Sequence, residues 1–162
     1  RLLKHIAIIM ISIEVVSDEE NWSKKIKKVE IFFKSICKSF PRKYQFLNKK
    51  IFITLFLSNN KSIKKLNKRF RKRNKATDVL SFPFEKKTKI KNNLYLGDIV
   101  ISFNFMDKPK NQKINLFKDK VIKTFIHGFL HLLGFDHMKQ SDYKKMLKEE
   151  ENIYHSVIKK IN

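Results

Sequence analysis

The chain has 162 residues, which is enough for one compact domain with a sizeable hydrophobic core. Lys and Arg number 37 against 15 Asp and Glu, and the resulting formal charge of +22 favours a polyanionic partner over a basic one. The chain has a single cysteine, which excludes an intrachain disulfide. It contains no run of ~20 apolar residues that would predict a membrane span. We therefore expect a reduced, cytoplasmic protein without membrane association.

The first part of the chain predicts a strand followed by a helix. Ile6 to Val15 is apolar and rich in β-formers, which predicts a buried strand. Ser17 and Glu20 have the spacing of a capping box and predict the start of one helix. The expected buried face of that helix has apolar residues at three- and four-residue steps: Trp22, Ile26, Val29, Phe33, Ile36 and Phe40. Cys37 lies on this face and is interpreted as a small core residue.

Two further strands are predicted on either side of a basic helix. Ile51 to Leu57 is short, apolar and β-rich, which predicts the second strand. Asp78 to Phe84 predicts the third, and Pro83 favours the end of that strand or a sheet edge because proline cannot donate to a ladder. The helix between them is expected to face inward with three residues: Ile63, Leu66 and Phe70.

The second half of the chain predicts a fourth strand and two long helices. A polar, mostly basic loop over Lys86 to Asn93 precedes a strand over Tyr95 to Phe103. Asn115 to Leu133 predicts a largely buried helix, with apolar residues at helical intervals: Leu116, Val121 and Phe125. Ser141 is expected to cap the last helix. Its predicted inward face is Tyr143, Leu147, Glu150, Tyr154, Val157 and Ile161.

The alternation of strands and helices indicates the architecture. No internal repeat and no long linker interrupts the pattern, so we expect one domain over residues 1–162. Its predicted fold class is α+β, with a mixed sheet of about four strands covered by helices.

Three of the five histidines fall within eleven residues at the end of the long helix. His127 and His131 are four apart and therefore lie one turn apart on the same helical face. Gly134 occupies the place of a left-handed C-terminal glycine, and a helix ending there lets His137 turn back toward the other two. Three imidazoles with a fourth position left open are typical of a catalytic zinc site. We therefore predict a metal site at these histidines, in preference to three unrelated core histidines.

Gly128 separates this pattern from that of zinc peptidases. Peptidases with two histidines four apart carry Glu directly after the first, as the general base. The chain has Gly128 there, which disfavours peptide hydrolysis and leaves a phosphodiester as the electrophile that the charge favours. A glycine inside a helix costs about 1 kcal/mol relative to alanine, so Gly128 also predicts a close approach or room beside the metal.

The positive charge is concentrated in one part of the chain. Residues 31–77 contain fifteen Lys and Arg and no acidic residue. Nine of these cations crowd together: Lys61, Lys64, Lys65, Lys68, Arg69, Arg71, Lys72, Arg73 and Lys75. The chain is rich in Lys, Asn, Ile and Phe, and compositional drift of this kind explains part of the overall charge. It explains the clustered arginines less readily. The cluster indicates a surface for a nucleic-acid backbone.

Three blocks of sequence together resemble one protein family. The first is HGFLHLLGFDH over His127 to His137. The second joins Leu66–Arg71 to Ala76–Phe84, and the third is Leu96–Ile101. Their order and spacing are similar to the signature of the bacterial YbeY family, single-strand-directed endoribonucleases that act in ribosomal RNA maturation. Phe70 and Phe135 stand where that family commonly has tyrosine.

The resemblance implies a fold similar to that of zinc peptidases and one zinc ion per chain at His127, His131 and His137. It implies a catalytic or phosphate-binding role for Arg71. Arg69, Lys72 and Arg73 are candidates for holding the RNA backbone.

The implied function is a single-strand-specific, zinc-dependent endoribonuclease in late maturation of the 3′ end of small-subunit ribosomal RNA and in ribosome quality control. Its implied partners are ribosomal RNA and the small ribosomal subunit, with no DNA substrate. A non-catalytic, metal-stabilised ribosome-assembly factor is the alternative, and a peptidase is disfavoured by Gly128 and by the basic charge.

Several polar and aromatic residues near these blocks have competing interpretations. Asp136 adjoins His137 and could accept the second N–H of a ligand or cap the turn. Asp98 follows Gly97 and is interpreted as a turn or strand-end residue. Three aromatic residues could stack bases: Phe82, Phe84 and Tyr95. Core packing is the preferred interpretation of all three, because the chain has fifteen phenylalanines.

Overall fold

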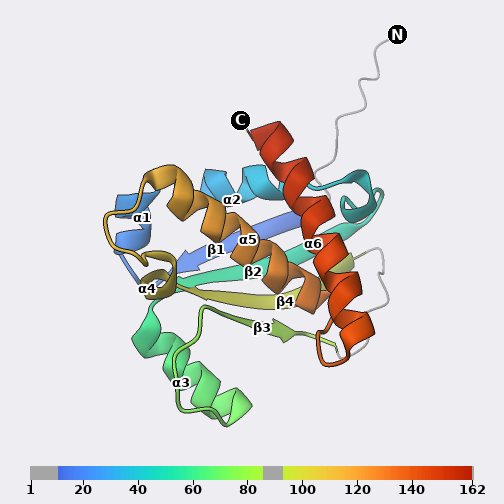
Figure 1. Cartoon of the computed structure of the whole chain (residues 1–162). Helices are drawn as coiled ribbons and strands as arrows, with labels where there is room; N and C mark the ends of the chain where they lie inside the picture. The colour runs from blue at the N-terminus through green and yellow to red at the C-terminus, as the bar shows by residue number, and fades with distance from the viewer. Residues whose placement is uncertain (1–10, 86–92, 162) are drawn as a thin grey trace.

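A computed structural model of the protein describes residues 11–85 and 93–161 (Figure 1). Four strands form one mixed sheet in the order β1-β2-β4-β3. β1 (Ile11–Ser17), β2 (Lys50–Ser58) and β4 (Asn93–Ser102) run parallel, whereas β3 (Val79–Pro83) pairs antiparallel with β4 at the edge. The predicted α+β class and four-stranded mixed sheet are confirmed, and so is the edge position of Pro83.

Helices cover both faces of this sheet to different extents. The described helices are α1 (Asn21–Lys25), α2 (Val29–Lys38), η1 (Arg42–Tyr44), α3 (Asn60–Arg71), α4 (Phe103–Met106), α5 (Ile114–Leu132) and α6 (Gln140–Ile161). α2 and α5 pack on one face and α6 lies across α5, whereas α3 lies at the β3 end of the sheet (Figure 1). None of the helices in the described ranges is both long enough and apolar enough to cross a bilayer.

Strand alternation divides the apolar residues into two clusters. Every second residue of β2 is buried beneath α2 and α5: Ile51, Ile53, Leu55 and Leu57. On the opposite face Ile63 of α3 packs with Leu80 of β3 and Val100 of β4 in a smaller cluster. The end of the sheet at β3 therefore has a helix on each side.

The predicted strands and the long helix are present, with ends shifted by one or two residues where they are described. Residues 6–10 of the predicted first strand and residues 86–92 of the predicted basic loop lie outside the described residues.

Cys37 is buried as predicted, and burial raises the pKa of its thiol to about 12. α6 begins at Gln140, one residue before the predicted cap Ser141, which lies inside the helix.

The single helix predicted after β1 is wrong, because the structure has two helices there. α1 ends at Lys25, its C-cap Ile26 has an extended backbone, and Lys28 adopts a left-handed conformation (φ 52°) before α2 starts. The buried face was nevertheless predicted correctly, since Trp22 and Phe33 are both fully buried. The apolar spacing continues through the break, and lysine is not a residue that normally marks a left-handed position.

The predicted capping box is also wrong. Ser17 is the last residue of β1, and its hydroxyl is placed to donate to the carbonyl oxygens of Glu19 and Leu57, each at 3.0 Å. Glu20 is the N-cap of α1 and makes no side-chain capping bond. Ser17 therefore joins the end of β1 to β2 instead of starting a helix.

Four apolar residues predicted to face inward are exposed: Phe70 (55%), Leu116 (59%), Tyr143 (52%) and Leu147 (40%). In α5 the other two predicted residues, Val121 and Phe125, are buried, and Phe117 is buried in place of Leu116. In α6 Val157 is buried as predicted, but Met146 and Ile153, each one residue before a predicted position, are buried nearer the start of the helix. In α3 the buried residues are Ile63 and Asn67. The end of this helix, where Phe70 lies, extends beyond the small apolar cluster that the helix covers.

β4 contains a bulge that the sequence did not reveal. Its register against β2 shifts at Phe52 and Ile53, and Gly97 adopts φ 138° there. A Cβ on Gly97 would lie 2.2 Å from the carbonyl oxygen of Phe82, so only glycine fits. The interpretation of Asp98 as a turn or strand-end residue is wrong, because Asp98 lies within β4 opposite Phe82.

Candidate metal centre

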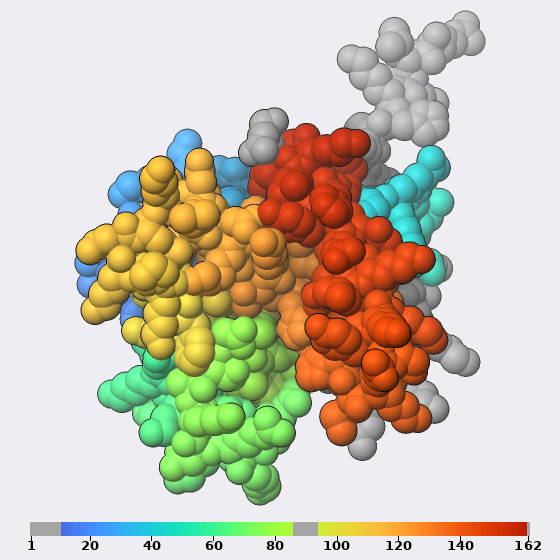
Figure 2. Space-filling view, in the orientation of Figure 1, coloured from blue at the N-terminus to red at the C-terminus, as the bar shows by residue number. Residues whose placement is uncertain are grey.

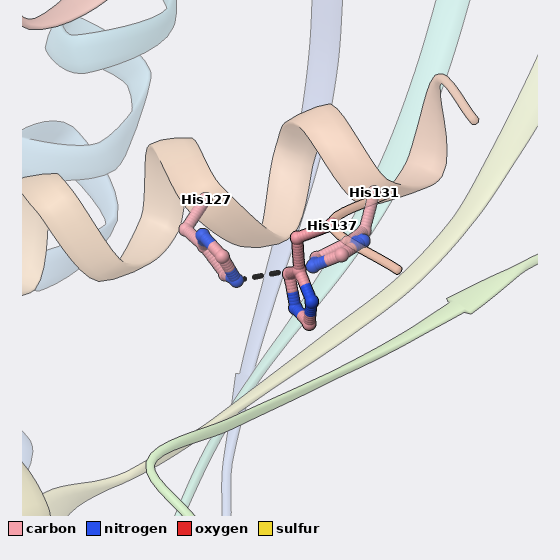
Figure 3. Close-up of side chains that lie close together, drawn as sticks. All are labelled: His127, His131 and His137. Atoms are coloured by element: carbon pink, nitrogen blue, oxygen red, sulfur yellow. Dashed lines mark hydrogen bonds between the residues drawn. The ribbon is translucent and has the colours of Figure 1, made fainter. Parts of the chain in front are cut away.

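Three histidines converge at the end of α5 (Figure 3). His127 and His131 project from the last turns of the helix, and His137 returns from the loop that follows. One ligand nitrogen from each ring lies within 4.8 Å of the other two, and Nε2 of His127 is 3.0 Å from Nε2 of His131. The structure thus brings together the three residues that the sequence predicted as metal ligands.

The turn that returns His137 is set by Gly134. Gly134 has φ 93°, as predicted for a left-handed residue after the helix. Its N–H donates to the His131 carbonyl oxygen at 3.0 Å, and the Phe135 N–H donates to the Leu130 carbonyl oxygen at 3.1 Å. This pair of bonds is a Schellman motif, which satisfies the last carbonyl groups of α5 and reverses the chain.

The protons of two imidazoles are directed away from the centre. Nδ1 of His131 lies 2.9 Å from the Phe135 carbonyl oxygen, which can only accept, so this nitrogen carries the proton. Nδ1 of His127 lies 2.5 Å from Oε1 of Glu150, an arrangement that favours a proton there too. Both Nε2 atoms then present lone pairs to each other at 3.0 Å, a repulsion that a bound cation would relieve. The separation is close to the ~3.3 Å edge of a tetrahedral site with ~2.05 Å zinc–nitrogen bonds.

Burial assists this arrangement at His131. The half-buried position of its ring lowers the pKa of His131, and the neighbouring His127 lowers it further. Neutral imidazole is the form that binds a metal, so the environment favours the ligand state before any ion arrives.

Glu150 contacts the histidine cluster, and this contact was not predicted from the sequence. It was placed on the inward face of the last helix, but its contact with His127 depends on the packing of α6 against α5. Asp136 does not take this role, since its Oδ1 accepts from the His137 N–H at 2.7 Å. Of the two interpretations of Asp136, the turn cap is correct.

Gly128 brings α5 onto the sheet. A Cβ there would lie 2.9 Å from Cγ2 of Ile99, 3.1 Å from Oγ of Ser81 and 3.3 Å from Cγ2 of Val79. The Ser81 hydroxyl donates to the Gly128 carbonyl oxygen at 2.9 Å across this contact. Gly128 therefore provides the close approach that was predicted, and the approach is to β3 and β4 and not to the metal position.

The histidines open into a cleft of about 630 Å³. Residues 67–83 form one wall and the segment from α5 to α6 forms the other, so the green and orange surfaces of Figure 2 face each other across it. Arg71, Arg73 and Lys75 line the cleft together with all three histidines. Arg69 and Lys72 are not among its lining residues, and Lys72 is the left-handed C-cap of α3 (φ 60°). The sequence analysis named Lys75 only as one of the nine clustered cations and assigned it no role of its own.

Arg71 is held in place by the edge strand. Its Nη2 donates to the Ser81 carbonyl oxygen at 2.7 Å, and its Cζ lies 5.8 Å from the centre of the Phe82 ring. A guanidinium has five N–H donors, so further donors remain for an anion in the cleft. Because Ser81 also binds Gly128, one residue connects Arg71 to the helix that carries His127.

The edge of β3 has a hydrogen-bonding pattern that bears on the substrate. The Ser102 N–H donates to the Asp78 carbonyl oxygen and the Phe84 N–H donates to the Leu96 carbonyl oxygen, each at 2.9 Å. In an antiparallel pair, every second residue directs its backbone N–H and C=O groups toward the partner strand. The backbone groups of the remaining residues of β3 therefore face outward: Val79, Ser81 and Pro83.

Three of these six outward N–H and C=O positions are already bonded or missing. The Val79 N–H donates to Oδ1 of Asp78 at 2.8 Å, and the Ser81 carbonyl oxygen accepts from Arg71. Pro83 has no N–H. Half of the backbone positions on this edge are therefore closed to an extended peptide, which makes the edge less suited to β-strand addition than an unpaired strand.

Comparisons with known proteins find similar sequences over most of the chain. The family described as "Endoribonuclease YbeY" matches residues 12–158. The endoribonuclease YbeY of Pelagibacter ubique (strain HTCC1062) is 63% identical over 152 residues, covering 94% of this chain and 99% of that one. The endoribonuclease YbeY of Sulfurihydrogenibium sp. (strain YO3AOP1) is 35% identical, covering 86% of this chain and 90% of that one.

A solved structure shows a similar fold. The solution structure of TM1509 from Thermotoga maritima matches with a TM-score of 0.55 at 23% identity. The likeness covers 90% of this chain and 89% of that protein, and it concerns the fold alone.

The histidine geometry predicts the effect of removing one ligand. We expect the parent protein to bind about one zinc ion per chain and His131→Ala to bind it at least ~100-fold more weakly, because two imidazoles remain. Isothermal titration with zinc measures both, and His155→Ala, which removes an exposed histidine from α6, is the matched control. Unchanged affinity in His131→Ala would exclude His131 as a ligand.

The contact at Gly128 predicts a cost for the smallest side chain. Overpacking against Ile99 and Ser81 costs ~1–3 kcal/mol, whereas alanine gains about 1 kcal/mol over glycine within a helix. We expect Gly128→Ala to lower the free energy of unfolding by roughly 1 kcal/mol and to weaken zinc binding, because α5 must move away from β3. Urea denaturation and zinc titration measure these effects, and a stabilised variant with parental zinc affinity would contradict the proposed contact.

Proposed function

This chain belongs to the YbeY endoribonuclease family, and we propose that it is a zinc-dependent endoribonuclease that cleaves single-stranded RNA. The observation that carries the proposal is that three convergent histidines and Arg71 line the same cleft. We further propose that it acts in the cytoplasm, in late maturation of the 3′ end of small-subunit ribosomal RNA and in ribosome quality control. Its partners are then ribosomal RNA and the small ribosomal subunit.

The histidines would hold the ion, with His127, His131 and His137 as its three protein ligands. Zinc bound there would supply a Lewis acid that could polarise a phosphoryl oxygen and make water available as a nucleophile near neutral pH. Glu150 and the Phe135 carbonyl group fix the tautomer and orientation of the first two rings. The described residues contribute three clustered ligands here, which leaves room for substrate or water in the coordination sphere.

Arg71 would stabilise the charge that develops on the scissile phosphate. Its bond to the Ser81 carbonyl oxygen fixes the guanidinium before substrate binds, so little ordering is needed during the reaction. The planar group can donate two parallel hydrogen bonds to phosphate oxygens. Arg71 is therefore the residue to which we assign a catalytic role beside the histidines.

The basic segment, by which we mean Lys61 to Lys75, would hold the RNA backbone. Within residues 11–85 and 93–161, none of the nine cations between Lys61 and Lys75 forms an ion pair with a carboxylate. Arg73 and Lys75 line the cleft and have the most direct access to a phosphate near the histidines. Arg69 and Lys72 do not line the cleft and would contact more distant phosphates.

The two alternatives fit these observations less well. A peptidase would need a general base after His127, but the chain has Gly128 there, and the edge that an extended substrate would use is partly occupied by Asp78, Arg71 and Pro83. A non-catalytic assembly factor would need the histidines for stability alone. It would give no reason for Arg71 to be fixed in the same cleft.

Substitution of Arg71 separates catalysis from binding. Arg71→Lys keeps the positive charge but loses the planar fork, so we expect RNA affinity within about twofold of the parent and cleavage at least ~100-fold slower. Single-turnover cleavage of a labelled single-stranded RNA and anisotropy measure the two quantities. Arg42→Lys, in η1, is the matched control and should cleave at the parental rate. Parental cleavage by Arg71→Lys would make Arg71 an ordinary member of the basic segment.

Salt dependence tests the path of the RNA backbone. Each neutralised phosphate contact flattens the plot of log affinity against log salt by ~0.7 for single strands, so Arg73→Gln combined with Lys75→Gln should flatten it by ~1.4. Lys159→Gln combined with Lys160→Gln removes the same charge from the end of α6 and should leave the slope unchanged. Equal slopes for the two double variants would place the backbone away from the cleft.

A further inference from the structure

Two aromatic rings lie in contact beside the cleft, and each has an arginine over it. Phe70 of α3 and Phe82 of β3 meet edge to face, with centroids 5.4 Å apart and an interplanar angle of 65°. Cζ of Arg69 lies 5.2 Å from the centre of the Phe70 ring, and Cζ of Arg71 lies 5.8 Å from that of Phe82. We call these four side chains the arginine–aromatic row.

The exposure of Phe70 has no explanation in core packing. Phe70 is 55% exposed, whereas α3 covers the sheet with Ile63, which packs against Leu80 and Val100. Single exposed apolar residues are common on protein surfaces and need no function. Phe70 differs because it touches a second aromatic ring, lies under a guanidinium and stands one residue before Arg71, which lines the metal cleft.

The charge around the row narrows the class of ligand. Residues 31–77 contain no carboxylate, and neither Arg69 nor Arg71 is ion-paired in the part of the chain that the structure describes. Cations alone would suit any polyanion. An exposed ring among cations suits a polyanion that also carries flat, apolar faces, and single-stranded RNA is such a molecule.

We propose that the arginine–aromatic row is a base-stacking site, in which an unpaired nucleobase stacks on Phe70 while an adjacent phosphate lies in the cleft beside Arg71. This inference rests on the proposed endoribonuclease function and adds a site of substrate selection to it. In a duplex each base face is covered by its neighbours, so a base can reach Phe70 only from an unpaired strand. Stacking tolerates every base, so the site would select single strands without selecting a sequence.

Phe82 has a different part in the row. It is only partly buried and contacts both the Phe70 ring and the Arg71 guanidinium, so it supports both. We assign Phe82 as a positioning residue and Phe70 as the residue that touches the base. The preferred interpretation of Phe82 as core is thus only partly right, and that of Phe84 is wrong, since Phe84 is 67% exposed.

Two probes of equal charge test the site. One is a single-stranded oligoadenylate, and the other is an abasic oligomer of the same length, which keeps the phosphates and lacks the bases. We expect Phe70→Leu to bind oligoadenylate about tenfold more weakly than the parent and to bind the abasic oligomer equally well. Phe52→Leu is the matched control, because Phe52 is also exposed (42%) but lies in β2, which does not adjoin β3.

A conservative variant gives a direct optical signal. Trp22 is the single tryptophan of the chain and is fully buried, so Phe70→Trp adds one exposed indole. Its fluorescence, measured against the parent protein, should be quenched by oligoadenylate and not by the abasic oligomer. Phe70→Trp should also bind oligoadenylate as tightly as the parent, because an aromatic face is retained.

The outcomes separate this inference from the function on which it rests. If the parent binds neither probe, the proposed RNA substrate is wrong and the stacking site with it. If the parent binds oligoadenylate and Phe70→Leu binds it equally well, only the stacking site is wrong. The stacking site is also wrong if Phe70→Leu weakens the binding of both probes alike, because the loss would then not depend on bases.

Discussion

The arrangement of the site depends on the contact between Ser81 of β3 and the backbone of α5. The Ser81 hydroxyl donates to the carbonyl oxygen of Gly128 at 2.9 Å, and its own carbonyl oxygen accepts from Arg71 at 2.7 Å. Only glycine lets the helix come this close to the strand. The position of the helix that carries His127 and the position of the arginine are therefore fixed by the same residue of an edge strand.

A second constraint assembles the histidines. The Schellman turn at Gly134 reverses the chain after α5, and the Phe135 carbonyl group orients His131 within that turn. Glu150 orients His127 from α6, so the centre depends on a helix that contributes no ligand. The imidazoles of His127 and His131 thus present the lone pairs of their Nε2 atoms to each other in the protein itself, and preorganisation of this kind strengthens metal binding.

The features that the sequence revealed are those with local causes. The histidine spacing and the glycine after it lie within one segment, so their convergence could be predicted from helix geometry and one left-handed turn. The contact of Glu150 with His127 spans 23 residues and depends on helix packing, which periodicity does not describe. Lys28 gives no sign of its left-handed conformation, so the break between α1 and α2 was missed. Phe70 was placed in the core because an apolar residue at a helical interval is usually buried.

The proposed mechanism requires the histidines and Arg71 to act on one phosphate. A crystal structure of the zinc-loaded protein with a single-stranded RNA whose scissile linkage resists cleavage would show whether they do. We expect one phosphate whose oxygens contact both the ion at His127, His131 and His137 and the guanidinium of Arg71, with Ser81 still bound to that arginine. Contact of the ion and of Arg71 with different phosphates, or an Arg71 side chain turned out of the cleft, would contradict the mechanism.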